Sequence, residues 1–232
     1  MTDSLNISFP VCSNKTVFHY GGQIVLVAEG KTAPRTVHRI DKLQELKISA
    51  TGALAVTDEA QALYHNGTLF HGESLQGISD IVHCDDKGLL LACQVPAVAS
   101  TKQHDFPLPT GSENTPLTNI FANDLVYQAM LVWVKKQLGL GSLPSTTASW
   151  TVYREVVVGE AFYLQLSVVS SSHTSKEAKK SRGYLTADIQ LLSRDNRLLA
   201  EVKSAKVTAS EGLNRLFLAN SHIDKKKTGE KV

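Results

Sequence analysis

The hydrophobic positions along the chain predict strands in its first and last thirds and one long helix between them. Residues 119–138 are almost continuously apolar, and Gly139 follows as a stop. Lys135 and Lys136 stand in the last turns, where the helix dipole favours cations. A helix that is apolar on every side has no face to present to water. We therefore expect this helix at the centre of the fold.

Strand-like runs flank the predicted helix. Residues 76–84 and 88–95 predict a hairpin around the turn Asp85-Asp86-Lys87-Gly88, and a second hairpin is expected at 16–28 around Gly21-Gly22. Residues 33–60 show little pattern, while 96–118 and 170–182 are polar and predict surface loops. After the helix, four further strands are predicted, at residues 150–158, 161–169, 184–192 and 198–208.

One buried helix among many strands predicts an α+β protein in which an antiparallel sheet wraps around one long central helix. The hot-dog fold has this architecture. We expect leader strands over 1–60, the hot-dog domain over 61–218 and a disordered charged tail over 219–232.

Composition narrows the classes of partner and compartment. The chain has 232 residues with 24 basic and 22 acidic side chains, and much of the small excess lies in the tail, so we expect no nucleic-acid partner. The sequence contains no signal peptide and no apolar run near the roughly 20 residues that cross a bilayer, so no membrane association is expected. The three cysteines, Cys12, Cys84 and Cys93, have no metal-ligand spacing and indicate reduced thiols in a cytoplasmic protein. The glycines form no phosphate loop, and we expect neither a cofactor nor a metal.

Two polar residues interrupt the apolar helix. Asp124 and Gln128 stand four residues apart and therefore share one face of it. A carboxylate in an apolar core costs several kcal/mol (on the order of 3–5) unless it is paired. Asp124 is therefore either a cap at the helix start or a working group, and capping and an acid role are compatible.

Two motifs carry a resemblance to a known family. His71-Gly72-Glu73-Ser74-Leu75-Gln76-Gly77 resembles the Tyr-Gly-Pro-x-Phe-Gln-Gly segment of polyketide-synthase dehydratase domains, with His71 in place of the Tyr. The stretch from Asp124 to Gln128 resembles the Leu-Asp-x-x-x-Gln motif that opens the helix of their second hot dog. Leu143-Pro144 followed by Trp150 resembles their Leu-Pro-x-x-Trp segment, and the whole looks most like the dehydratase-like C-terminal region of bacterial polyunsaturated fatty acid synthases.

The resemblance implies dehydration of a 3-hydroxyacyl chain carried on acyl carrier protein, in company with other synthase domains. Asp124 would be the acid that protonates the departing hydroxyl, with Gln128 as its support. The side chains that line or shape the acyl tunnel would be His71, Gly72, Gln76 and Tyr127. A homodimer is compatible with this class.

One departure from the family leaves two functions open. The family's base is a His in a His-x-x-x-Gly-x-x-x-x-Pro pattern, and none of the eight histidines here has Gly four residues on. The chain thus resembles the second half of a double hot dog with a short leader. It is either a dehydratase-type component that is incomplete alone, or a non-catalytic hot dog that binds an acyl chain or scaffolds the synthase.

Overall fold

The computed structural model describes residues 2–3, 24–25, 54–96, 119–172 and 182–218. The chain divides into two units, Met1–Pro34 and Arg35–Val232. In the first unit, β1 (Thr2–Asp3) pairs antiparallel with β2 (Ile24–Val25). Most of the predicted hairpin at 16–28, most of the loops predicted at 96–118 and 170–182, and the tail at 219–232 lie outside the described residues.

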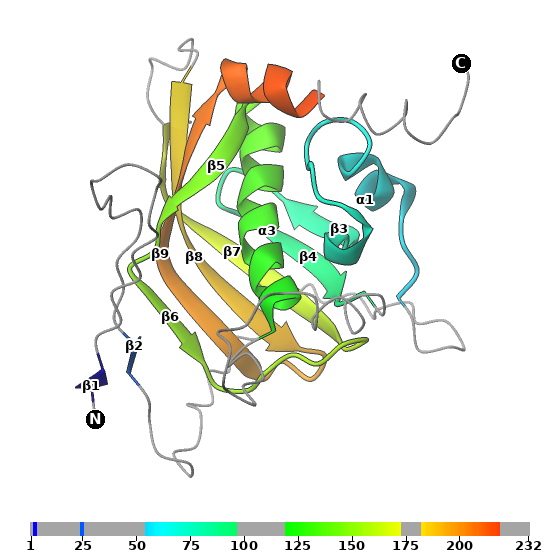
Figure 1. Ribbon diagram of the computed structural model, residues 1–232, viewed down its shortest axis with the longest axis vertical. Coiled ribbons are helices and arrows are strands. Elements are labelled where there is room, and N and C mark those ends of the chain that lie inside the picture. Colours follow the sequence, from blue (N-terminus) through cyan, green and yellow to red (C-terminus); the bar gives the residue numbers. More distant parts are fainter. Residues whose placement is uncertain (1, 4–23, 26–53, 97–118, 173–181, 219–232) are drawn as a thin grey trace, which may run out of the picture. The chain divides into compact units, whose positions relative to one another are not determined.

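The second unit is built on one antiparallel sheet of seven strands in the order β3-β4-β7-β8-β9-β5, with β6 also paired to β9 (Figure 1). The strands are β3 (Ile78–Cys84), β4 (Gly88–Gln94), β5 (Gly141–Thr146), β6 (Ser149–Val152), β7 (Ala161–Ser171), β8 (Arg182–Ser193) and β9 (Leu198–Ser210). The predicted hairpin of β3 and β4 is confirmed, and Asp85 closes its turn by accepting hydrogen bonds from the backbone N–H groups of Lys87 and Gly88.

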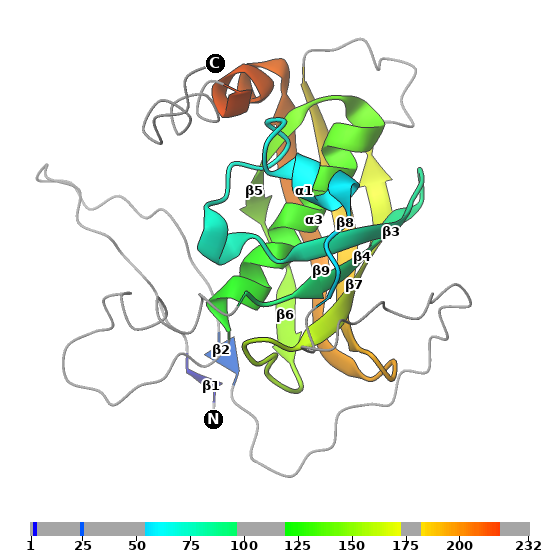
Figure 2. The same cartoon turned by 90° about the vertical axis from the view of Figure 1, so that its right-hand side faces the viewer.

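Helix α3 (Ile120–Leu138) lies against the inner face of this sheet, which curves around it (Figures 1 and 2). The helix ends at Gly139, whose positive φ of 69° is the left-handed conformation that glycine adopts without strain. Eleven of its residues are buried, and the largest, Trp133, is fully buried while its indole N–H donates to the carbonyl of Asp85 at 2.9 Å. The predicted central helix and the hot-dog class are confirmed.

Short elements close the other side of α3. Helix α1 (Asp58–Leu63) packs on β3, and the 3₁₀ turn η1 (Glu73–Leu75) packs on α3. The hydroxyl of Thr57 caps α1 by accepting from the N–H of Ala60, and Lys136 of α3 forms an ion pair with Glu59 of α1. The sequence pattern indicated neither α1 nor the helix at 211–218.

Two strand predictions need correction. The strand predicted at 150–158 ends at Val152, because the next two N–H groups, of Tyr153 and Arg154, both turn to the carbonyl of Leu199. Strand β5 was not predicted, since Gly141 and Pro144 are poor strand residues. It pairs with β9 alone among the described strands, and proline is tolerated in such an edge strand.

Candidate functional site

Asp124 lies in the second turn of α3 and does not cap the helix. The cap is Asn119, whose side-chain oxygen accepts from the N–H groups of Phe121 and Ala122 at 3.0 and 3.1 Å. The capping interpretation of Asp124 is therefore wrong. The Asp124 side chain is 31% exposed.

Gln128 is fully buried and holds Asp124 directly. Its Nε2 donates to Asp124 Oδ2 and to the carbonyl of Leu75, each at 2.7 Å. Its Oε1 accepts from the hydroxyl of Tyr64 at 2.8 Å. The predicted stacking of Asp124 and Gln128 on one helix face is confirmed, and all polar atoms of the amide are satisfied.

His71 faces the same carboxylate from the loop that precedes η1. Its Nε2 lies 3.4 Å from Asp124 Oδ2, and only 8% of its side chain is exposed. Nδ1 is buried and has no hydrogen-bond partner among the described residues. Burial lowers the pKa of the His71 imidazole, and the charge of Asp124 offsets part of that shift, so the ring is neutral at neutral pH.

Aromatic and amide contacts fix the loop that carries His71. The ring of Phe70 stacks on the imidazole with centroids 4.5 Å apart and planes 19° from parallel. Gln76 donates from Nε2 to the carbonyl of His71 at 3.0 Å. The orientation of the imidazole is thus set by Phe70 and Gln76, which belong to the same loop region as His71, and not by α3.

The structure distributes the other predicted tunnel residues over several places. Gly72 begins η1 beside His71 and is exposed, with open space where a side chain would stand. Tyr127 is half-buried, and its hydroxyl lies 3.0 Å from that of Thr147, in the loop between β5 and β6. The structure therefore brings together Asp124, Gln128 and His71, with Gly72 and Gln76 in the supporting loop, whereas Tyr127 is bonded elsewhere.

Tyr64 is a residue of the site that sequence reasoning missed. It follows α1, is buried, and its hydroxyl accepts from the N–H of Ile78 at 3.1 Å as well as donating to Gln128. A tyrosine hydroxyl usually finds a hydrogen-bond partner when it is buried, so a tyrosine in an apolar segment is the signal that the sequence offers. The partner is 64 positions away and cannot be identified from the sequence.

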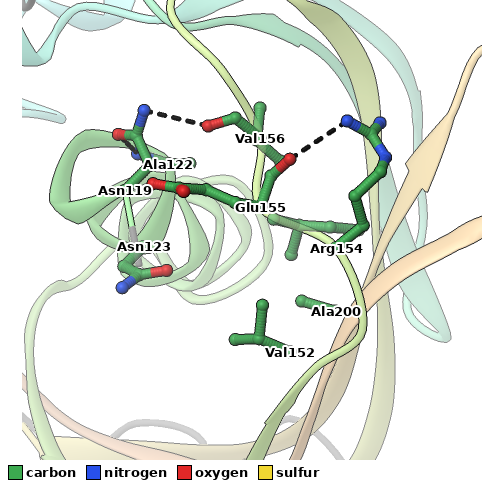
Figure 3. A pocket seen from close by; sticks show the side chains of 9 residues that line it. Asn119, Ala122, Asn123, Val152, Arg154, Glu155, Val156 and Ala200 are labelled. Carbon is green, nitrogen blue, oxygen red and sulfur yellow. Dashed lines mark hydrogen bonds between the residues drawn. The ribbon is translucent and has the colours of Figure 1, made fainter. Parts of the chain in front are cut away.

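A shallow pocket lies at the first turn of α3 (Figure 3). It is lined on the helix side by Asn119 and Asn123 and on the other by Arg154 and Glu155, and Asn119 Nδ2 donates across it to the carbonyl of Val156. Asp124 and His71 do not line it. This pocket is thus separate from the His71–Asp124 pair.

Within the described ranges, no group of three or more His, Cys, Asp or Glu side chains could hold a metal ion. None of the helices in those ranges is long and apolar enough to cross a membrane.

Residues 43–216 match the family described as polyketide synthase dehydratase N-terminal domain. The chain belongs to this family. The resemblance predicted from the two motifs is thereby confirmed. The family is named for an N-terminal domain, whereas the motifs predict the second half of a double hot dog, and the choice of half stays a prediction.

Three individual proteins are similar to this chain. A polyunsaturated fatty acid synthase protein from Thraustochytrium sp. is 29% identical over 154 residues, which is 66% of this chain but only 5% of that relative. The CurJ dehydratase, crystallised as an inactive mutant in complex with a compound, superposes with a TM-score of 0.55 at 15% identity, covering 94% of this chain and 66% of its own. The GphF dehydratase 1 reaches a TM-score of 0.49 at 13% identity over 72% of this chain and 53% of its own. The CurJ likeness shows a shared fold.

Proposed function

We propose that this chain is a dehydratase-type component of a polyketide or polyunsaturated fatty acid synthase, which removes water from 3-hydroxyacyl chains carried on acyl carrier protein. The observation that carries the proposal is the contact of 3.4 Å between His71 Nε2 and Asp124 Oδ2 in a dehydratase-family hot dog. A neutral imidazole beside a carboxyl group is the pair that this elimination needs. The family and its synthase relative supply the substrate class and the partners, acyl carrier protein and other synthase domains.

In the proposed step, His71 takes the hydrogen on the α carbon as a proton, and the electrons of that bond form the double bond to the β carbon. The bond from the β carbon to its hydroxyl breaks, and Asp124, which must enter this step in its protonated form, transfers its proton to the leaving oxygen, which departs as water. The imidazolium and carboxylate that result stand 3.4 Å apart and stabilise each other. The proton that His71 gained then passes to Asp124, through solvent at the partly exposed carboxylate, and this transfer restores both groups.

His71 therefore takes the role of the base that the missing His-x-x-x-Gly-x-x-x-x-Pro pattern left open. Gln128 is a positioning residue for Asp124, and Gln76 holds the loop that presents His71. Gly72 leaves room beside the imidazole for the acyl chain, since nothing lies within 4 Å of where its side chain would be. Tyr127 would contact the chain from the next turn of α3. The cytoplasm is the proposed compartment, because Cys84 and Cys93 are free thiols.

The rival function, a non-catalytic hot dog that binds an acyl chain or scaffolds the synthase, makes a different prediction. The chain is incubated with a 3-hydroxyacyl carrier protein, with and without further synthase domains, and the carrier-bound acyl group is weighed by mass spectrometry. Loss of one water in the presence of the chain alone supports the dehydratase proposal. Binding without loss of water, in both arms, identifies the rival.

A further inference from the structure

The hydrogen bonds around Gln128 have one consistent direction. The Tyr64 hydroxyl accepts from the N–H of Ile78 and has a single hydrogen, which it donates to Gln128 Oε1 at 2.8 Å. On the other side, Gln128 Nε2 meets two acceptors, the carbonyl of Leu75 and Asp124 Oδ2. A reversed amide would point its oxygen at both acceptors and leave them without donors. Tyr64, Leu75 and Asp124 together therefore select this amide orientation, and Tyr64 is the only one of the three that bonds to the amide oxygen among the described residues.

We propose that Tyr64 is a positioning residue for the dehydration, which acts through Gln128 by fixing the amide so that Nε2 donates to Asp124 Oδ2. The inference rests on the proposed function and adds to it the atom that delivers the proton. Because Oδ2 accepts from Gln128, Oδ1 is the oxygen left to carry the proton in the proposed step. A swinging carboxyl would present either oxygen to the substrate, and this chain of bonds removes that freedom.

Tyr64 itself is not the acid or the base. Its side chain is buried and its hydroxyl is occupied by Ile78 and Gln128. Burial raises the pKa of the Tyr64 hydroxyl far above its ordinary value, so the phenol keeps its proton throughout the working range of pH. Its effect on the reaction must therefore pass through the amide of Gln128.

A double-mutant cycle in the complete chain tests this inference. Tyr64→Phe keeps the ring and removes the hydroxyl, and Gln128→Met keeps the volume and removes the amide. Each single variant should lower kcat for 3-hydroxyacyl carrier protein about ten- to a hundredfold with little change in KM, the size of one hydrogen bond to a charged group. The double variant should be no slower than Gln128→Met alone, because Tyr64 acts only through that amide. Losses that multiply, or a Tyr64→Phe variant with wild-type kcat, would overturn the inference.

Control variants separate positioning from packing. Tyr163→Phe removes the hydroxyl of another buried tyrosine, in the separate core cluster formed by β4, β7, β8 and β9, and should leave kcat unchanged. If Tyr64→Phe fails to fold, Gln128→Met decides, since it removes both the acceptor for Tyr64 and the donor to Asp124. A fall in kcat with little change in KM supports the inference, and wild-type kcat contradicts it.

An NMR titration of His71 tests the position of Asp124 without any measurement of turnover. The carboxylate of Asp124 is the charged group that raises the pKa of His71 against its burial. Release of Asp124 in Tyr64→Phe or Gln128→Met should therefore move the His71 titration to lower pH, and Tyr163→Phe should not. An unmoved titration overturns the positioning role. If the wild-type chain does not dehydrate the substrate but the variants still shift the His71 titration, the proposed function is refuted and the positioning of Asp124 by Tyr64 stands.

Discussion

Replacement of Asp124 by asparagine should abolish dehydration while leaving the fold nearly as stable as before. The carboxyl group is the proton donor of the proposed step, and an amide cannot replace it. General acid catalysis contributes about 10²–10⁴ in rate, so kcat should fall by about that factor. KM should change little, because the side chain keeps its size and its place on α3.

The structure sets the stability cost of Asp124→Asn at about 1 kcal/mol or less. Helix capping is untouched, since Asn119 is the cap. The new amide oxygen can still accept from Gln128, so the loss is the difference between a hydrogen bond to a charged group and one to a neutral group, about 1 kcal/mol. No strong ion pair is lost, because His71 is neutral near pH 7 and the Asp124 side chain is 31% exposed. The melting temperature should fall by no more than about 4 °C.

The assay follows formation of the enoyl product on the carrier protein by mass spectrometry, alongside thermal melting. Asp188→Asn is the matched control, since the side chain of Asp188 is also 31% exposed and accepts hydrogen bonds from Lys203 and from the N–H of Ser204. It should cost comparable stability and leave turnover unchanged. Wild-type turnover by Asp124→Asn would refute the acid role, and unfolding of that variant would refute the small stability cost.

Three further changes test other parts of the structure. Because burial lowers the pKa of His71 in the folded chain, the unfolded chain binds a proton first as the pH falls below about 6.5. Wild-type stability should therefore drop between about pH 7 and pH 5 more steeply than the stability of His71→Gln. Chemical denaturation at each pH measures both slopes, and equal slopes would contradict this expectation. A side chain on Gly77 would stand 2.8 Å from both the carbonyl oxygen of Gln94 and Leu125 Cδ1, so Gly77→Ala should cost about 1–3 kcal/mol in urea denaturation, whereas Gly72→Ala, which faces open space, should cost little. Asn119→Ala removes two capping bonds and the bond to the Val156 carbonyl, and should cost about 2–4 kcal/mol of unfolding free energy; a cost below about 0.5 kcal/mol would show that another residue caps α3.

Local features of the site could be predicted from the sequence. The helix was predictable because residues 119–138 are apolar on all sides and Gly139 follows as a stop. The pairing of Asp124 with Gln128 follows from helix geometry alone, since residues four apart lie on one face. The hairpin of β3 and β4 was predictable from another local signal, the turn sequence Asp-Asp-Lys-Gly between two apolar runs.

The contacts that complete the site could not be predicted. His71 is 53 residues before Asp124, and only the packing of η1 on α3 brings the two together. The family's base pattern does not point to His71, because His71 occupies a position where another segment of the family has a tyrosine. Tyr64 could not be assigned to the site either, because its partner Gln128 lies on another element, 64 positions away. Capping was assigned to Asp124 as an alternative because both Asn119 and Asp124 are good caps, and only the backbone decides which one starts the helix.

The most direct test of the central claim is single-turnover dehydration of a 3-hydroxyacyl carrier protein by the purified chain and by its His71→Tyr variant, which restores the residue of the family pattern. The claim is that His71 and Asp124 form the acid–base pair within this one hot dog. The wild-type chain should form the enoyl product without any added synthase region, and His71→Tyr should bind the same carrier protein but form product at least about 10²-fold more slowly. Product formation by His71→Tyr at the wild-type rate would contradict the claim and assign the base to another group.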